Sequence, residues 1–98
     1  MESDCGVGKA LRLIGSKWTL NIIHALCERT KRFGEIQREL TLISPRTLSL
    51  RLQQLEADGI IHKKVFAEVP PHVEYSLTEK GASLKKIILL LDRWGQAQ

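Results

Sequence analysis

Apolar residues recur at helical spacing through most of the chain. This spacing predicts a first helix that ends at Gly15, and a second helix that runs from a cap at Ser16 to about Cys27. Apolar positions cover most of the circumference of the second helix, so we expect it to be central and largely buried. The apolar positions of the first helix are Val7, Ala10, Leu11 and Ile14.

The middle of the chain predicts two helices in close succession. A very short strand is expected at Arg32-Phe33, followed by a short helix over Gly34 to Leu40 with Glu35 in its first turn. Thr41-Leu42-Ile43 then turns into the next helix. Two helices joined by about three residues have the spacing of a helix-turn-helix.

The second of these helices has a clear start and stop. Ser44 is a preferred N-cap, and Pro45 falls at the first helical position, where its missing N–H costs nothing. Gly59 is suited to the left-handed conformation just past a helix end. We expect one buried stripe, formed by Leu48, Leu52 and Leu55.

The opposite face of this helix is polar around a central Leu50. Arginine can pair with guanine, glutamine with adenine, and an apolar side chain with the thymine methyl, so this face suits the major groove of DNA. A solvated helix surface is the alternative. Arg51 projects beside the buried stripe, so we expect it to pair with a carboxylate or a phosphate rather than with a base. The candidate reading residues are Ser44, Pro45, Arg46, Thr47, Ser49, Leu50, Gln53 and Gln54.

A hairpin is predicted directly after this helix. Ile60 to Ala67 has strand composition, and apolar and polar residues alternate from Val73 to Thr78. The tip between the strands holds two prolines, which cannot donate to a strand ladder. Its position makes the hairpin the wing of a winged helix-turn-helix. The residues expected to meet DNA phosphates or the minor groove are Lys63, Lys64, Pro71 and His72.

One last helix is expected after Thr78, which is placed as its cap. Its first apolar face consists of Leu84, Ile87, Ile88, Leu91 and Trp94, and a second consists of Leu89 and Leu90. A helix that is apolar on two faces needs two partners, and a chain this small has one core to offer. We therefore expect a second subunit to cover part of this helix; the alternative is a helix packed wholly within its own chain.

The chain is thus predicted to be a single α+β domain over residues 1–98. The fold is mostly helical, a winged helix-turn-helix with a two-stranded wing and a C-terminal dimerisation helix. The formal charge of +4 and a pI near 9.3 fit a polyanionic partner only weakly. Glu2 and Asp4 replace the basic start of a signal peptide, and no apolar run is long enough to span a membrane, so we expect a cytoplasmic protein.

The motifs resemble those of the HxlR-type winged-helix transcriptional regulators, which are related to MarR. The resemblance covers almost the whole chain and is carried by Gly15-Ser16-Lys17-Trp18-Thr19, Lys31-Arg32-Phe33-Gly34-Glu35-Ile36, Ile43 to Ser49, Arg51-Leu52, Leu55-Glu56, Gly59-Ile60-Ile61, Glu68 to Thr78 and Trp94-Gly95. It implies a homodimer on double-stranded operator DNA, in which the first and last helices build the dimer interface. A two-fold dimer implies an operator that is an inverted repeat. The interface residues expected are Val7, Leu11, Leu84, Ile87, Ile88, Leu89, Leu90, Leu91 and Trp94.

The two cysteines carry different expectations. Cys5 matches the position at which relatives of this family use a cysteine to sense oxidants or electrophiles, and a thiol near a helix N-terminus is more reactive. The alternative for Cys5 is a small apolar residue in the dimer interface. Cys27 is expected to be buried packing. His24 could share a face with Cys27, but metal sites need three or four ligands, so we expect no metal and no cofactor.

Two other functional classes remain as alternatives. A winged helix can serve protein–protein contact or dimerisation without reading DNA, but such modules often lose the basic wing and the polar face that this chain keeps. An enzyme is disfavoured, because the sequence has no glycine-rich phosphate loop and no grouping of nucleophile, base and acid with a recognisable spacing.

Overall fold

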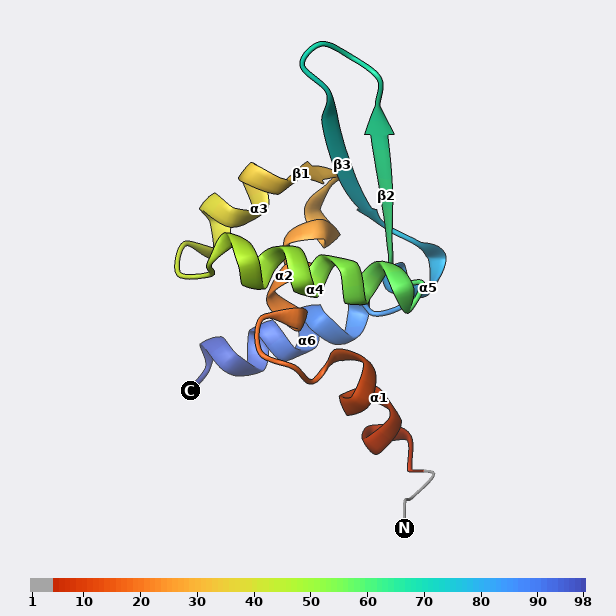
Figure 1. The fold of residues 1–98 in the computed structure, drawn as a ribbon. Helices are drawn as coiled ribbons and strands as arrows, with labels where there is room; N and C mark the ends of the chain where they lie inside the picture. Colours follow the sequence, from red (N-terminus) through yellow and green to blue (C-terminus); the bar gives the residue numbers. More distant parts are fainter. Residues whose placement is uncertain (1–4) are drawn as a thin grey trace.

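A computed structural model describes residues 5–98 and confirms a mostly helical α+β winged-helix fold with a C-terminal helix (Figure 1). Glu2 and Asp4 lie outside the described residues. Within them, no helix has the length and apolar character needed to cross a bilayer. The elements are α1 Gly6–Ile14, α2 Thr19–Glu28, β1 Lys31–Arg32, α3 Phe33–Leu40, α4 Pro45–Ala57, β2 Ile61–Phe66, β3 His72–Leu77, α5 Glu79–Ala82 and α6 Lys85–Gln96.

The hairpin is part of a three-stranded antiparallel sheet with strand order β1-β3-β2. In the hairpin, Ile61 lies opposite Leu77 at the base and Phe66 opposite His72 near the tip. β1 adds a short third strand, in which Lys31 pairs with Tyr75. The predicted two-stranded wing is therefore anchored at its base by a third strand, while its outer half projects beyond the helices (Figure 1).

The core forms around α2, as the distribution of apolar residues predicts. Ile22 and Ile23 are fully buried there, and Tyr75 of the central strand is also buried. The predicted stripe of α4 faces this core, because Leu48, Leu52 and Leu55 are all buried. The remaining members of the core cluster are Leu26, Ile36, Ile43, Ile60, Ile61 and Ile88.

Two predicted boundaries were wrong near the start of the chain. Ser16 does not cap α2: its carbonyl accepts the N–H of Thr19 in a turn, and α2 begins only after Trp18, whose φ is 78°. The short strand lies one residue earlier than expected, because Phe33 opens α3 instead. Strand residue Arg32 also serves as the N-cap of α3.

The expected single last helix is two helices. Thr78 does cap the first of them, since its Oγ1 accepts the N–H of Gly81 at 3.1 Å and also donates to the carbonyl of Gly59. The N–H of Leu84 bonds to the carbonyl three residues back, at Gly81, in a tighter turn than an α-helix makes. This turn at 83–84 separates α5 from α6 and lets α6 take its own direction.

The first helix stands apart from the rest of the chain. α1 contains no buried residue and projects from the body at the opposite end from the wing (Figure 1). The Cα radius of gyration is 14.2 Å, larger than the roughly 13 Å of a compact chain of about 100 residues. α1 therefore gains little stability from its own protomer.

Candidate nucleic-acid interface

The start of α4 is built as the sequence predicts. The Oγ of Ser44 accepts the N–H of Thr47 at 3.1 Å and donates to the Thr47 hydroxyl, and Pro45 follows the cap. Ile43 and Leu48 are buried on either side of the cap, as a hydrophobic staple requires. The hydroxyls of Ser44 and Thr47 are therefore engaged in the cap. Their observed role is to stabilise the start of α4.

The outer face of α4 is solvent-exposed over its whole length. Leu50 at its centre is 48% exposed. Around it lie a cation at Arg46, a hydroxyl at Ser49 and an amide at Gln53, all exposed. Donors, acceptors and an apolar group therefore share one convex surface beside the wing.

Arg51 and Gln54 of α4 are hydrogen-bonded to each other. The Nε of Arg51 donates to the backbone carbonyl of Lys17 at 3.0 Å, and its Nη1 donates to Oε1 of Gln54 at 3.1 Å. Arg51 therefore pairs with a carbonyl and an amide. Of the two expected partners, a carboxylate is absent from its described contacts, and a phosphate stays a prediction. Gln54 is exposed but is held by Arg51, which distinguishes it from Gln53.

The two wing lysines are both exposed but face opposite ways. Neighbouring residues of a strand alternate between the faces of a sheet. Lys63 lies opposite Tyr75, a residue of the core side, whereas Lys64 lies opposite Glu74. The ammonium of Lys64 also lies 4.9 Å from the centre of the Phe66 ring. Lys63 thus belongs to the face that continues toward α4.

His72 does not offer its ring to phosphates as expected. Its Nδ1 lies 2.8 Å from Oε1 of Glu68, and its Nε2 lies 3.2 Å from Oε2 of Glu74. Its ring also stacks on Phe66, with centroids 4.4 Å apart. Two carboxylates occupy the ring nitrogens and would repel a phosphate, so His72 stiffens the outer half of the wing. Pro71 beside it is exposed near the tip.

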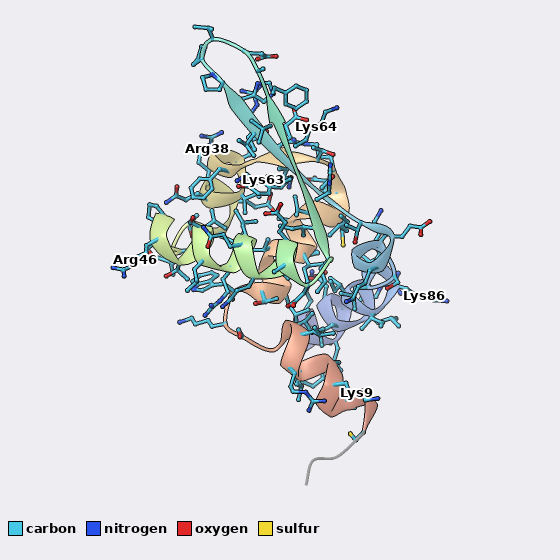
Figure 2. The ribbon with its side chains drawn as sticks, turned by 45° about the vertical axis from the view of Figure 1, so that its right-hand side comes forward. Lys9, Arg38, Arg46, Lys63, Lys64 and Lys86 are labelled. Carbon is cyan, nitrogen blue, oxygen red and sulfur yellow. The ribbon has the colours of Figure 1, made fainter. Side chains whose placement is uncertain are left out.

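Arg38 is an exposed cation on α3 that adds to this surface, and it was not among the residues predicted from the sequence. Arg38 lies in the last turn of α3, the first helix of the helix-turn-helix. Figure 2 shows Arg38, Arg46 and Lys63 around α3, α4 and the wing, whereas Lys9 and Lys86 lie at the lower right on α1 and α6. Ile36 and Leu40 are four residues apart and share the inner face of α3, which leaves Arg38 between them on the outer face; this spacing was the available signal.

Ion pairs fix the entry into α3. Glu35 accepts the backbone N–H of Arg32 at 2.8 Å and pairs with Arg29 at 2.9 Å. The hydrogen bond from Arg29, followed by that from the Arg32 backbone, lowers the pKa of Glu35 to about 2. Glu35 is therefore charged at neutral pH and completes the first turn of α3.

Lys31 is a buried cation between two carboxylates. Its Nζ bonds to Glu28 of α2 and Glu39 of α3, and its side chain is only 2% exposed. Burial by itself would lower the pKa of Lys31, but the hydrogen bonds to both glutamates outweigh burial and raise it. This charged bridge joins the central helix to the helix-turn-helix.

The last helix leaves most of its apolar surface uncovered. Among the predicted stripe residues, only Ile88 is buried, at 4% exposure, and Leu84 is half-buried against the core. Burial in its own chain corrects the assignment of Ile88 to a dimer interface, whereas the half-buried Leu84 stays a predicted interface residue. The others, at 48–65% exposure, are Ile87, Leu89, Leu90, Leu91 and Trp94. The alternative of a helix packed wholly within its own chain is therefore wrong.

The first helix also exposes large apolar side chains. Val7 is 68% exposed and Leu11 is 61% exposed. Because α1 has no buried residue, both of these side chains lie outside the core of the described protomer. Exposed apolar residues thus occur on both of the helices expected to form an interface.

The cysteines lie in different surroundings. Cys5 is the exposed N-cap of α1, where its Sγ accepts the N–H of Gly8 at 3.4 Å. Cys27 is half-buried against the core, close to the packing role expected of it. Burial raises the pKa of the Cys27 thiol, and nearby Lys85 offsets this only in part. Across residues 5–98, no three His, Cys, Asp or Glu side chains are grouped to hold a metal.

A family model described as HxlR-like helix-turn-helix matches residues 13–98. The chain belongs to the HxlR-like helix-turn-helix family. The HTH-type transcriptional regulator YybR of Bacillus subtilis strain 168 is 44% identical over 96 residues, covering 98% of this chain and 77% of YybR. This HxlR-family chain is accordingly a DNA-binding transcriptional regulator.

Solved structures of two regulators share this fold over 96% of the chain. The redox regulator HypR in its oxidized form is 44% identical, with a TM-score of 0.91, covering 96% of this chain and 97% of that one. The reduced form of the transcriptional regulator YodB from B. subtilis is 36% identical, with a TM-score of 0.80, covering 96% of this chain and 91% of that one. The HxlR-family fold therefore includes α1 and α6 as well as the helix-turn-helix.

Proposed function

We propose that this HxlR-family regulator binds an inverted-repeat operator as a homodimer. In this proposal, the outer face of α4 reads bases in the major groove, and Lys63, on the wing face that continues toward α4, contacts phosphates. The observation that carries the proposal is the exposed face of Arg46, Leu50 and Gln53 beside a basic wing. Arg38 joins the phosphate contacts, because the first helix of a helix-turn-helix crosses the DNA backbone.

The uncovered apolar surface supports the homodimer. α1 and α6 expose side chains as large as Leu11, Leu90 and Trp94. Soluble monomers seldom leave contiguous apolar surface of this kind in water. A second copy of the chain presents the same helices, so a two-fold axis would bring like surfaces together. Such a dimer would set its two α4 helices about one DNA turn (roughly 34 Å) apart, or a multiple of that distance.

Selection from a random duplex pool tests this proposal. The full chain is incubated with the pool, bound DNA is recovered over several rounds, and the enriched sequences are aligned. We expect an inverted repeat, with binding that weakens steeply as salt rises. Sedimentation of the protein alone should show a dimer. Enrichment of no sequence, together with salt-insensitive binding, would contradict the proposal and favour a protein-interaction module.

Two variants separate base reading from phosphate contact. Arg46→Ala should cost about 1–3 kcal/mol on the selected operator and relax the preference at one base pair of each half-site. Lys63→Ala should instead weaken binding to all DNA alike and reduce the salt slope by about one. Gel shifts over a salt series measure both effects. Normal operator binding by Arg46→Ala would show that the face is wrongly assigned.

We also propose that oxidation of Cys5 alters operator binding. Cys5 is exposed at the N-cap of α1, a helix assigned to the dimer surface, and HypR, a redox regulator, is similar over the whole chain. Oxidation of the Cys5 sulfur would alter its hydrogen bond to Gly8 and thereby the start of α1.

Operator binding before and after a mild oxidant tests the role of Cys5. Gel shifts are run for the wild type and for Cys5→Ser, and Cys27→Ser serves as the matched control for the half-buried thiol. We expect oxidant to change binding of the wild type and of Cys27→Ser, but not of Cys5→Ser. Equal responses of wild type and Cys5→Ser would remove Cys5 from the mechanism.

A further inference from the structure

The junction between α1 and α2, residues 15–18, forms a turn with an unusual backbone conformation. Base reading by α4 does not by itself explain this conformation. Residues 15–18 belong to the motif Gly15-Ser16-Lys17-Trp18-Thr19. Trp18 adopts a left-handed backbone with φ 78°, which is unfavourable for a bulky residue. The ammonium of Lys17 lies 5.6 Å from the centre of the Trp18 ring. Through this junction the exposed helix α1 joins the buried helix α2.

The recognition helix reaches this junction through one side chain. Arg51 donates from Nε to the carbonyl of Lys17 at 3.0 Å and from Nη1 to Oε1 of Gln54 at 3.1 Å. A single planar guanidinium therefore joins the backbone of the junction to an exposed amide of α4. Among the hydrogen bonds of residues 5–98, that from Arg51 to Lys17 is the one that joins the junction to α4.

Packing is incomplete beside this bond. A solvent-open hollow of about 270 Å³ lies between the end of α1 and the second half of α4, and Arg12, Ser16, Gln54 and Asp58 are among the residues that line it. Because this hollow is open to water, side-chain packing does not close the space between α1 and this part of α4. The Arg51 bond therefore lies beside a part of the interface that packing does not fix.

We infer that Arg51 is a positioning residue that ties the placement of Gln54 on the reading face to the α1–α2 junction. A displacement of α1 that moves the Lys17 carbonyl would move or release the guanidinium, and with it the amide of Gln54. This inference rests on the proposed reading of bases by α4. According to this inference, a movement of α1, the helix proposed to lie in the dimer interface, changes which DNA bases α4 prefers. Arg51 itself contacts no base.

The test uses the full chain and the operator that the wild type selects. The base pair read by Gln54 is defined as the position whose preference Gln54→Ala relaxes. We expect Arg51→Met to weaken operator binding about ten-fold and to relax the same base pair. In the Gln54→Ala background, Arg51→Met should then change binding less than about two-fold. Arg51→Lys should behave like Arg51→Met, because an ammonium lacks the planar fork that spans both partners.

Salt dependence separates this role from a phosphate contact. Arg51→Met should leave the salt slope of operator binding unchanged, whereas loss of a phosphate contact would reduce it by about one. A reduced salt slope together with full rescue by Arg51→Lys would overturn the inference. It would also be overturned if Arg51→Met weakened operator binding equally in the wild type and in the Gln54→Ala background. If Arg51→Met does not fold, Arg51→Gln is used with the same outcomes. Failure of the wild type to select any sequence would instead contradict the proposed function, and the inference with it.

Discussion

At the scale of single residues, Glu35 illustrates how one side chain both caps a helix and fixes a loop. It accepts the N–H of Arg32 and pairs with Arg29, which lies before β1. Both hydrogen bonds favour the carboxylate, and its pKa falls from 4.5 to about 2. The charged form of Glu35 therefore stabilises the folded state at any pH above its unfolded pKa.

This gives a pH-dependent prediction for Glu35→Gln. Since the folded-state pKa is the lower one, the stabilisation by Glu35 is complete above about 4.5 and is lost as pH falls toward about 2. Urea unfolding at a series of pH values should show wild type more stable than Glu35→Gln at pH 7, with a difference that narrows below about pH 4.5. A difference that stays constant down to pH 3 would contradict the role of the charge.

At the scale of elements, α5 packs closely against Ile60, the residue that precedes β2. A Cβ at Gly81 would lie 2.2 Å from the carbonyl oxygen of Ile60 and 3.1 Å from Cδ2 of Leu77. The carbonyl is backbone and cannot turn aside. Glycine at position 81 therefore lets α5 pack here without moving the backbone.

We predict that Gly81→Ala destabilises the chain by about 1–3 kcal/mol, because either α5 or the start of β2 must move. Gly95 on α6 is the matched control, since a Cβ there meets nothing within 4 Å. Gly95→Ala should be neutral or stabilising by up to about 1 kcal/mol. The urea midpoints of wild type, Gly81→Ala and Gly95→Ala measure these changes in stability. A midpoint of Gly81→Ala equal to that of the wild type would show that α5 tolerates the displacement.

At the scale of the whole molecule, the protein has two exposed regions with different chemistry. Exposed polar residues of α4 and the wing form one region, and exposed apolar residues of α1 and α6 form the other. In Figure 1, α1 and α6 lie below α4 and the wing. This separation lets one region contact a second copy while the other contacts DNA. In a dimer, each protomer would then contribute one α4 helix to a shared operator.

Leu90→Glu tests this arrangement. A charge on the exposed surface of α6 should convert the dimer to a monomer in sedimentation, because burying an unpaired carboxylate in an apolar interface is costly. Affinity for the inverted repeat should fall on the order of 100-fold as the two half-sites lose their linkage. Val69→Glu is the control: Val69 is fully exposed at the wing tip, so this variant should remain a dimer. A dimeric Leu90→Glu would place the interface elsewhere.

Local signals predicted the elements of the site well. Ser44, Pro45 and Gly59 bounded α4 correctly, because caps and helix stops depend on residues within a few positions. The prediction for His72 was wrong although its partners are close in sequence: Glu68 and Glu74 are four and two residues away, and the pattern of residues does not show that both carboxylates turn toward the ring. The partner of Arg51 is 34 residues away, so no local pattern could indicate it.

The sequence alone determined the order of the elements as far as β3, the buried stripe of α4 and the polar character of its outer face, because all of these follow from spacing along one helix or strand. Tertiary structure decided which polar groups remain available. It tied Gln54 to Arg51, enclosed His72 between carboxylates, buried Ile88 and left its neighbours on α6 exposed. The burial of Ile88 and the bond from Arg51 to Lys17 depend on distances between segments remote in the chain, and those distances exist only once the core has packed. The partners of Gln54 and His72 are within four residues, but which of the neighbouring side chains pair is decided by how the helix and the hairpin tip orient them.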